Sequence, residues 1–201
     1  MALRVDENLR RMGRVLADGD PDAAEAMLAA DDEIDAMNVS LMDRCYTVLR
    51  TEAPLASDLR LVVSVLRILS ELERIGDLTL RVAKTAPEHD LLRSCPEGHV
   101  LLCSMARIAE ERYQLALAAW ARTDLDAAEE LSRSGAMIEP LQSELVEVLT
   151  RATGADVARL AIVCSSIGRT LDRIVDHTVI IGARVRYLIT GEVDHLAAEV
   201  R

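Results

Sequence analysis

Residues 17–25 read ADGDPDAAE and residues 121–129 read ARTDLDAAE, so six of nine positions are identical at an offset of 104 residues. A second match, at an offset of 99 residues, joins residues 72–77 (LERIGD) to residues 171–176 (LDRIVD). Further matches in that register are Arg60 with Arg159, Leu61 with Leu160 and Ile68 with Ile167. A chain that matches itself twice in order, about 100 residues apart, is internally duplicated.

The segments around these matches have the composition and spacing of amphipathic helices. Gly and Pro number only 9 and 5 among 201 residues, and apolar residues recur at spacings of three and four. Helix-capping or helix-breaking residues separate the segments, such as Asp20 before Pro21 and Thr153 before Gly154. Six helices are predicted, over residues 2–17, 21–50, 55–84, 96–122, 125–152 and 155–190.

Duplication and helical periodicity together predict an all-α fold of two tandem three-helix bundles. Short loops make successive helices antiparallel neighbours, and each repeat contains three of the six helices. The first repeat is expected over residues 1–85 and the second over residues 96–191. A linker at 86–95 separates the two repeats, and a C-terminal tail at 192–201 follows the second.

Composition and charge exclude several functions. The chain has 23 Lys and Arg against 34 Asp and Glu, which gives a net charge of -11, and only 2% of its residues are aromatic. Neutralising phosphates takes a basic face, and gripping single strands also takes stacking rings, so we expect no nucleic-acid partner. The four cysteines form no C-x-x-C pair, so no zinc or redox motif is present among them. No apolar stretch is long enough for a signal peptide or a membrane span. These features predict a cytoplasmic protein with reduced thiols and no membrane insertion.

The third helix of each predicted repeat carries two carboxylates four residues apart. Glu73 and Asp77 share one helical face in the first repeat, and Asp172 and Asp176 share one in the second. Carboxylates that converge between helices make an oxygen-rich site for a cation such as Mg, Mn, Fe or Zn. The possible facing ligands are Asp32 and Asp35, with Asp31 beside them, in the first repeat, and Glu139 in the second.

Ordinary charge pairing is the alternative explanation for these carboxylates. Arg74 and Arg81 lie three residues before and four residues after Asp77, and Arg173 lies three residues before Asp176. The same arrangement in both repeats is harder to attribute to solvated surface. His177, next to Asp176, is expected to pair with a carboxylate rather than to bind a metal.

Several of these segments together resemble the PhoU family of phosphate-signalling regulators. They are residues 54–60 (PLASDLR), 72–77 (LERIGD), 172–177 (DRIVDH) and 187–192 (YLITGE), and they follow the family's order along nearly the whole chain. The resemblance implies two three-helix bundles. It also implies a cytoplasmic regulator that restrains the phosphate-starvation response with the phosphate-specific ABC transporter and its sensor histidine kinase. Finally, it implies metal clusters whose candidate ligands here are Glu73, Asp77, Asp172 and Asp176.

The chain departs from this family at the metal motif, and its first helix begins late. Arg81 and Ile180 stand where family members usually carry Asn, four residues after the last motif Asp. Gly135 and Ala136 replace opposing carboxylates in the second repeat. We therefore expect metal occupancy to be weaker than the family norm, and to be stronger in the first repeat if Arg81 turns to solvent. The predicted function is a non-enzymatic regulatory adaptor, expected as a homodimer. The alternatives are a carboxylate-bridged metal enzyme and a metal-storage bundle.

Overall fold

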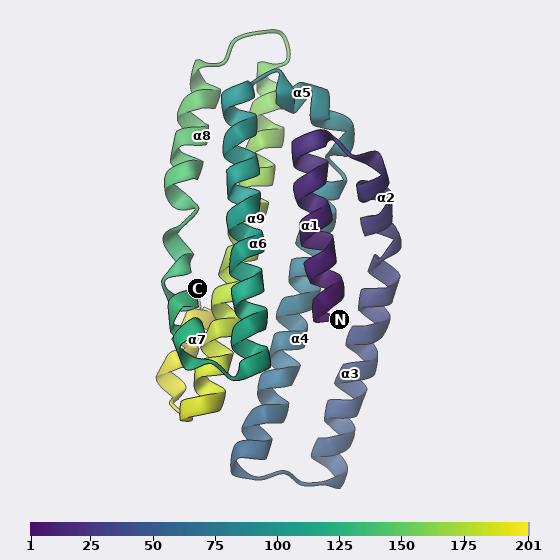
Figure 1. Ribbon diagram of the computed structural model, residues 1–201, viewed down its shortest axis with the longest axis vertical. Coiled ribbons are helices and arrows are strands. Elements are labelled where there is room, and N and C mark those ends of the chain that lie inside the picture. Colours follow the sequence, from purple (N-terminus) through teal and green to yellow (C-terminus); the bar gives the residue numbers. More distant parts are fainter. Residues whose placement is uncertain (201) are drawn as a thin grey trace.

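Figure 1 shows the computed structural model of the protein, which describes the backbone of residues 1–200 and the side chains of residues 1–197. Every regular element of this part of the chain is helical, which confirms the predicted all-α class. The α-helices are α1 (Ala2–Asp18), α2 (Pro21–Ala29), α3 (Asp31–Thr51), α4 (Ala56–Ala83), α5 (His89–Arg93), α6 (Pro96–Arg122), α7 (Leu125–Ser132), α8 (Glu139–Arg151) and α9 (Val157–Thr190). Shorter 3-10 turns are η1 (Ala86–Glu88), η2 (Ser134–Ala136) and η3 (Val193–Val200).

These elements form two three-helix bundles in tandem. The first consists of α1, the α2–α3 pair and α4, and the second of α6, the α7–α8 pair and α9. Asp20 caps α2 by accepting a hydrogen bond from the Ala23 N–H at 2.9 Å. Asp124 caps α7 by accepting one from the Ala127 N–H at 3.1 Å. The predicted start signals of these two helices are therefore confirmed in both repeats.

Two of the six predicted helices are interrupted, so the continuous helices expected over 21–50 and 125–152 are wrong in detail. In the first repeat the break falls at Ala30, and three acidic residues in the first turn of α3 favour a new helix N-terminus there. In the second repeat Pro140 has no N–H to continue the hydrogen bonds of a preceding turn, so α8 begins beside it. The expected linker also contains helix, because η1 and α5 occupy most of it.

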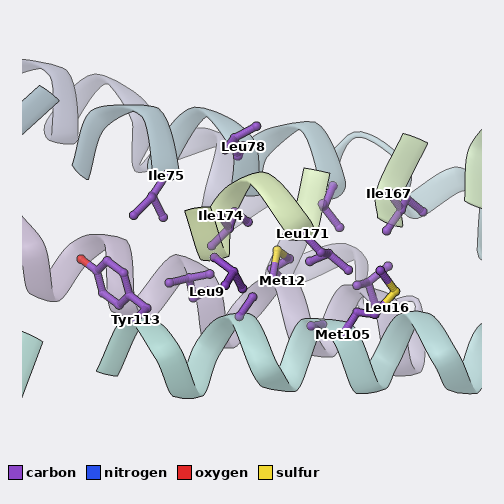
Figure 2. Packing of buried hydrophobic residues seen from close by; sticks show 14 of the residues in the cluster. Leu9, Met12, Leu16, Ile75, Leu78, Met105, Tyr113, Ile167, Leu171 and Ile174 are labelled. Carbon is purple, nitrogen blue, oxygen red and sulfur yellow. The ribbon is translucent and has the colours of Figure 1, made fainter. Parts of the chain in front are cut away.

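The two bundles share one continuous core. Helices α4 and α9 pack along each other, α6 packs against α9, and α1 packs against α4 and α6. Figure 2 shows Leu9 and Met12 of α1, Met105 of α6 and Leu171 of α9 pointing into a common interior, and all four are fully buried. Each such side chain contributes roughly 1.5–3 kcal/mol of burial free energy. The hydroxyl of buried Tyr113 also donates to the Ala2 carbonyl at 2.8 Å, which ties α6 to the start of α1.

The buried apolar side chains of these helices form one core cluster. Among residues 1–200, no helix combines the length and the hydropathy that a bilayer crossing requires. The four cysteines are free thiols, of which Cys95 and Cys164 are buried. Burial raises the pKa of the Cys164 thiol to about 11, and nearby Cys95 adds to the effect. This thiol therefore stays protonated near neutral pH.

Candidate functional site

The first carboxylate cluster lies between the first turns of α3 and the second half of α4. Burial, followed by the charges of Asp77 and Asp35, raises the pKa of Glu73 above its ordinary value. The pKa of Asp31 is raised in the same way, by burial first and then by Asp35 and Asp77. Helix geometry thus brings four predicted carboxylates into one repelling group. Asp32 is exposed, and its charge raises the pKa of Asp31 less than the charge of Asp35 does. Asp32 therefore lies at the margin of this group.

The second carboxylate cluster contains fewer oxygens. Burial raises the pKa of Asp172, and the charges of Asp176 and Glu139 raise it further. These three residues are the ones that the sequence predicted for the second repeat. Gly135 and Ala136 lie in the η2 turn. They occupy positions that correspond to acidic residues of the first repeat. The second cluster therefore has fewer carboxylates than the first.

Charge pairing does not explain the carboxylates of the first cluster. Arg74 directs its Nη1 to Glu71 Oε1, at 3.4 Å, rather than to Asp77. Arg81 is exposed, and none of the ion pairs found within the described residues joins it to Asp77. Neither arginine forms an ion pair with Asp77, but the charge of Arg74 lowers the pKa of Glu73 and so offsets part of the repulsion.

The donor chemistry of the first cluster suits a hard divalent cation, since all of its candidate ligands are carboxylate oxygens. The raised pKa values of Asp31 and Glu73 come first from burial and then from neighbouring carboxylates, and the charges of Lys84 and Arg74, respectively, offset only part of this effect. Within the described part of the chain, however, no three His, Cys, Asp or Glu side chains are arranged to hold a metal ion. The oxygens are gathered in one region but do not form a closed ligand set.

A buried hydrogen bond that the sequence did not predict joins the two bundles. Glu71 of α4 is completely buried, and its Oε2 lies 2.6 Å from His177 Nδ1 of α9. Its other oxygen, Oε1, accepts from Arg67 Nη2 at 3.1 Å. His177 therefore does pair with a carboxylate, but that carboxylate is on the other repeat rather than beside it. The signal for Glu71 was its place between Ile68, Leu72 and Ile75 on the apolar face of α4.

A hollow of about 960 Å³ opens where the α8–α9 connection passes the start of α6. Its charged lining includes Arg151, Asp156 and Arg159, and Arg159 is already bound to Glu88 at 2.6 Å. No histidine contributes to this lining among the residues that the structure describes. A nucleophile activated by histidine is therefore not assembled there.

The fold and the two carboxylate clusters define the class of protein. It is an internally duplicated, all-helical bundle with a carboxylate cluster on each repeat. The family model for the PhoU domain matches residues 1–86 and 102–185, which together make up most of the chain. The chain therefore belongs to the PhoU family, and the family resemblance seen in the sequence is confirmed.

Similar proteins from several bacteria support this assignment. The phosphate-specific transport system accessory protein PhoU homolog of Pseudomonas aeruginosa is 29% identical over 195 residues, covering 96% of this chain and 81% of that protein. The homolog of Deinococcus radiodurans is 31% identical over 165 residues, covering 80% of this chain and 76% of that protein.

Two crystal structures resemble the whole fold. PhoU from Pseudomonas aeruginosa matches with a TM-score of 0.88 and 28% identity, over 96% of this chain and 93% of that chain. The phosphate transport system regulatory protein PhoU from Streptococcus pneumoniae matches with a TM-score of 0.80 over 95% of this chain and 90% of that chain. Because identity to the latter is only 22%, that match shows the fold alone.

Proposed function

We propose that this protein is a regulatory adaptor that restrains phosphate uptake and phosphate-starvation signalling. It acts in the cytoplasm through contacts with the phosphate-specific ABC transporter and with a sensor histidine kinase. The observation that carries the proposal is the match to the PhoU family along both repeats. The relatives that share this match are named as accessory proteins of the phosphate-specific transport system.

The charge of the chain supports a mechanism based on protein contacts. A net charge of -11 and an aromatic content of 2% oppose binding to the phosphate backbone of a promoter. Long-range attraction instead favours basic surfaces on partner proteins and accelerates their encounter. The exposed acidic start of α3, with Asp32 and Glu33, lies at one edge of the first carboxylate cluster and suits such a partner.

A divalent cation at the first cluster is a secondary proposal. Asp31, Asp35, Glu73 and Asp77 would hold it, and its positive charge would reduce the repulsion among these carboxylates. Cation binding would draw the first turns of α3 toward α4 and reduce the negative charge on this face. Glu139, Asp172 and Asp176 would form the weaker second site.

A non-enzymatic role agrees with the names of the relatives, which describe accessory and regulatory proteins. A metal enzyme needs a closed set of protein ligands with an open coordination position. No feature of the described residues favours that alternative or a metal-storage bundle.

Direct binding measurements test the adaptor proposal. Purified protein is titrated against the cytoplasmic part of the sensor kinase and against the nucleotide-binding subunit of the transporter, each at low and at high salt. We expect saturable binding to at least one of them, weakened by salt because the steering charges are exposed. Absence of binding to both proteins at low salt would contradict the proposal, and specific binding to promoter DNA would contradict its electrostatic basis.

A further inference from the structure

Two of the four cysteines lie at the end of the molecule where α6 and α9 begin. Cys95 is the N-cap residue of α6 and directly follows α5, and both of these helices pack against α9. Cys164 lies in the second turn of α9. Figure 1 shows α6 and α9 starting at the same end of the molecule, next to α5. Both cysteine side chains belong to the core cluster.

Contacts around two glycines place these cysteines against the same small region. A Cβ added at Gly98 of α6 would lie 3.2 Å from Cys95 Sγ and 3.5 Å from Leu145 Cδ1 of α8. The other methyl carbon of Leu145, Cδ2, would lie 3.4 Å from a Cβ added at Gly168 of α9. Gly168 is four residues after Cys164 and therefore lies on the same face of α9. The two cysteines thus face the region in which α6, α8 and α9 meet.

Electrostatic interactions identify these two thiols as neighbours. Burial, followed by the charge of Cys95, raises the pKa of the Cys164 thiol to about 11. The other two cysteines, Cys45 and Cys103, interact with charged side chains rather than with a thiol. Packing does not require a sulfur at position 164, because Val65 occupies the matching position of the first repeat at the offset of 99. Within the described side chains, Cys95 and Cys164 are therefore the thiol pair that can react with each other.

The two thiols differ in their access to solvent. Cys95 is 9% exposed and lines the hollow of about 960 Å³ between the α8–α9 connection and the start of α6. Cys164 is 0% exposed. A small oxidant that enters the hollow therefore reaches Cys95 first. Cys164 is protected from direct oxidation because it is buried and protonated, and the thiolate is the reactive form. An accessible thiol next to a buried one is the arrangement of a reactive cysteine with its resolving partner.

We propose that Cys95 and Cys164 form a reversible disulfide that ties the start of α6 to α9 when the protein meets a peroxide. The Cys95 thiolate attacks one oxygen of hydrogen peroxide, the O–O bond breaks, and the leaving hydroxide takes up the proton that the thiol released. The Cys164 sulfur then attacks the sulfur of the Cys95 sulfenic acid. The S–O bond breaks, and the oxygen leaves as water with the Cys164 proton. Two thiols are thus oxidised to one disulfide while one peroxide is reduced to two waters, and a dithiol reductant reverses the change.

This bond would change the second repeat in two ways. It would enclose α6, α7 and α8 in one covalent loop, which restricts the unfolded chain and so stabilises the folded one. It would also fix the wall of the hollow that Cys95 and the start of α6 form. In a reducing cytoplasm such a disulfide is a transient response to an oxidant rather than a permanent link. The inference is independent of the proposed regulatory function, because its test needs neither the transporter nor the kinase.

Peptide mapping of the full chain tests the inference without any variant. Reduced wild-type protein is treated with a small molar excess of hydrogen peroxide and then digested in the absence of reductant. We expect a peptide that joins Cys95 to Cys164, and the loss of two of the four free thiols when thiols are counted in urea. Oxidation should also raise Tm by roughly 5–15 °C. Dithiothreitol should reverse all three changes.

Two variants separate this disulfide from unspecific oxidation. Cys164→Val introduces the residue found at the matching position of the first repeat. It should abolish the cross-link and leave a Cys95 sulfenic acid that dimedone labels. The matched control is the double variant Cys45→Ser with Cys103→Ser, which should keep both the cross-link and the rise in Tm; circular dichroism confirms that each variant is folded. Absence of the Cys95–Cys164 peptide from folded, peroxide-treated wild-type protein would overturn the inference, and so would a cross-link that forms only after unfolding in urea.

Discussion

Replacement of Glu71 by leucine should destabilise the protein far more than the same change at Glu73. The Glu71 side chain is 0% exposed, and it accepts from His177 across the boundary between the repeats. Leucine has a similar volume but leaves the buried imidazole, which is 11% exposed, without its partner. Breaking a buried pair from one side costs about 3–5 kcal/mol. For a chain of this size that loss lowers Tm by roughly 10 °C.

The assay is urea denaturation followed by far-ultraviolet circular dichroism, on Glu71→Leu, His177→Leu and the double variant. Because the double variant leaves neither polar group unpaired, its cost should fall below the sum of the single costs by at least about 1.5 kcal/mol. Glu73→Leu lies two residues further on α4 and should be neutral or stabilising, since it removes repulsion from Asp77 and Asp35. Equal costs for Glu71→Leu and Glu73→Leu, or additive costs in the cycle, would refute the role assigned to the buried pair.

Three further predictions concern packing, pH and metal. Gly182→Ala should lower the free energy of unfolding by about 1–3 kcal/mol, because the added Cβ would lie 2.8 Å from the Leu131 Cβ. Gly13→Ala should raise it by about 0.5–1 kcal/mol, because an added Cβ there meets no other atom. Thermal melts of the two variants check both predictions. The raised pKa of Glu73 means that the folded state binds this proton more tightly than the unfolded chain. Its ionised form therefore destabilises the fold at neutral pH, and stability is regained as pH falls through the range just above 4.5. Glu73→Gln should be the more stable protein at pH 7 and lose that advantage near pH 4 in urea titrations. Asp77→Asn should lower bound Mn²⁺, measured by elemental analysis, more than Asp176→Asn does, and unchanged content in the double variant would move the ligands elsewhere.

The fold was predictable because its signals are local and repeated. Asp20 and Asp124 mark the same helix start in both halves, and the duplication implies a tandem arrangement without any contact information. The prediction of one helix over 125–152 overlooked the signal at Pro140, since proline ends the hydrogen-bond pattern of a preceding turn. The break at Ala30 was not, because alanine is the best helix former and the helix restarts one residue later.

The candidate site was predictable only in part. Residues four apart on one helix share a face, so the grouping of Glu73 with Asp77 followed from spacing alone. The pairing of Glu71 with His177 depends on the axial register of α4 against α9. No local sequence pattern specifies that register. The 44% exposure of Leu61, against 5% for its match Leu160, likewise depends on which helices pack over each repeat, which only the three-dimensional arrangement shows.

We propose that this chain restrains the phosphate-starvation response, and deletion of its gene in the source organism is the decisive experiment. The measurement is the activity of a phosphate-starvation promoter, fused to a reporter, in phosphate-rich medium. The promoter should be active in the deletion strain and silent again when the wild-type chain is restored. A promoter that stays silent in phosphate-rich medium without this protein, and responds normally to starvation, would show that the chain does not restrain this response.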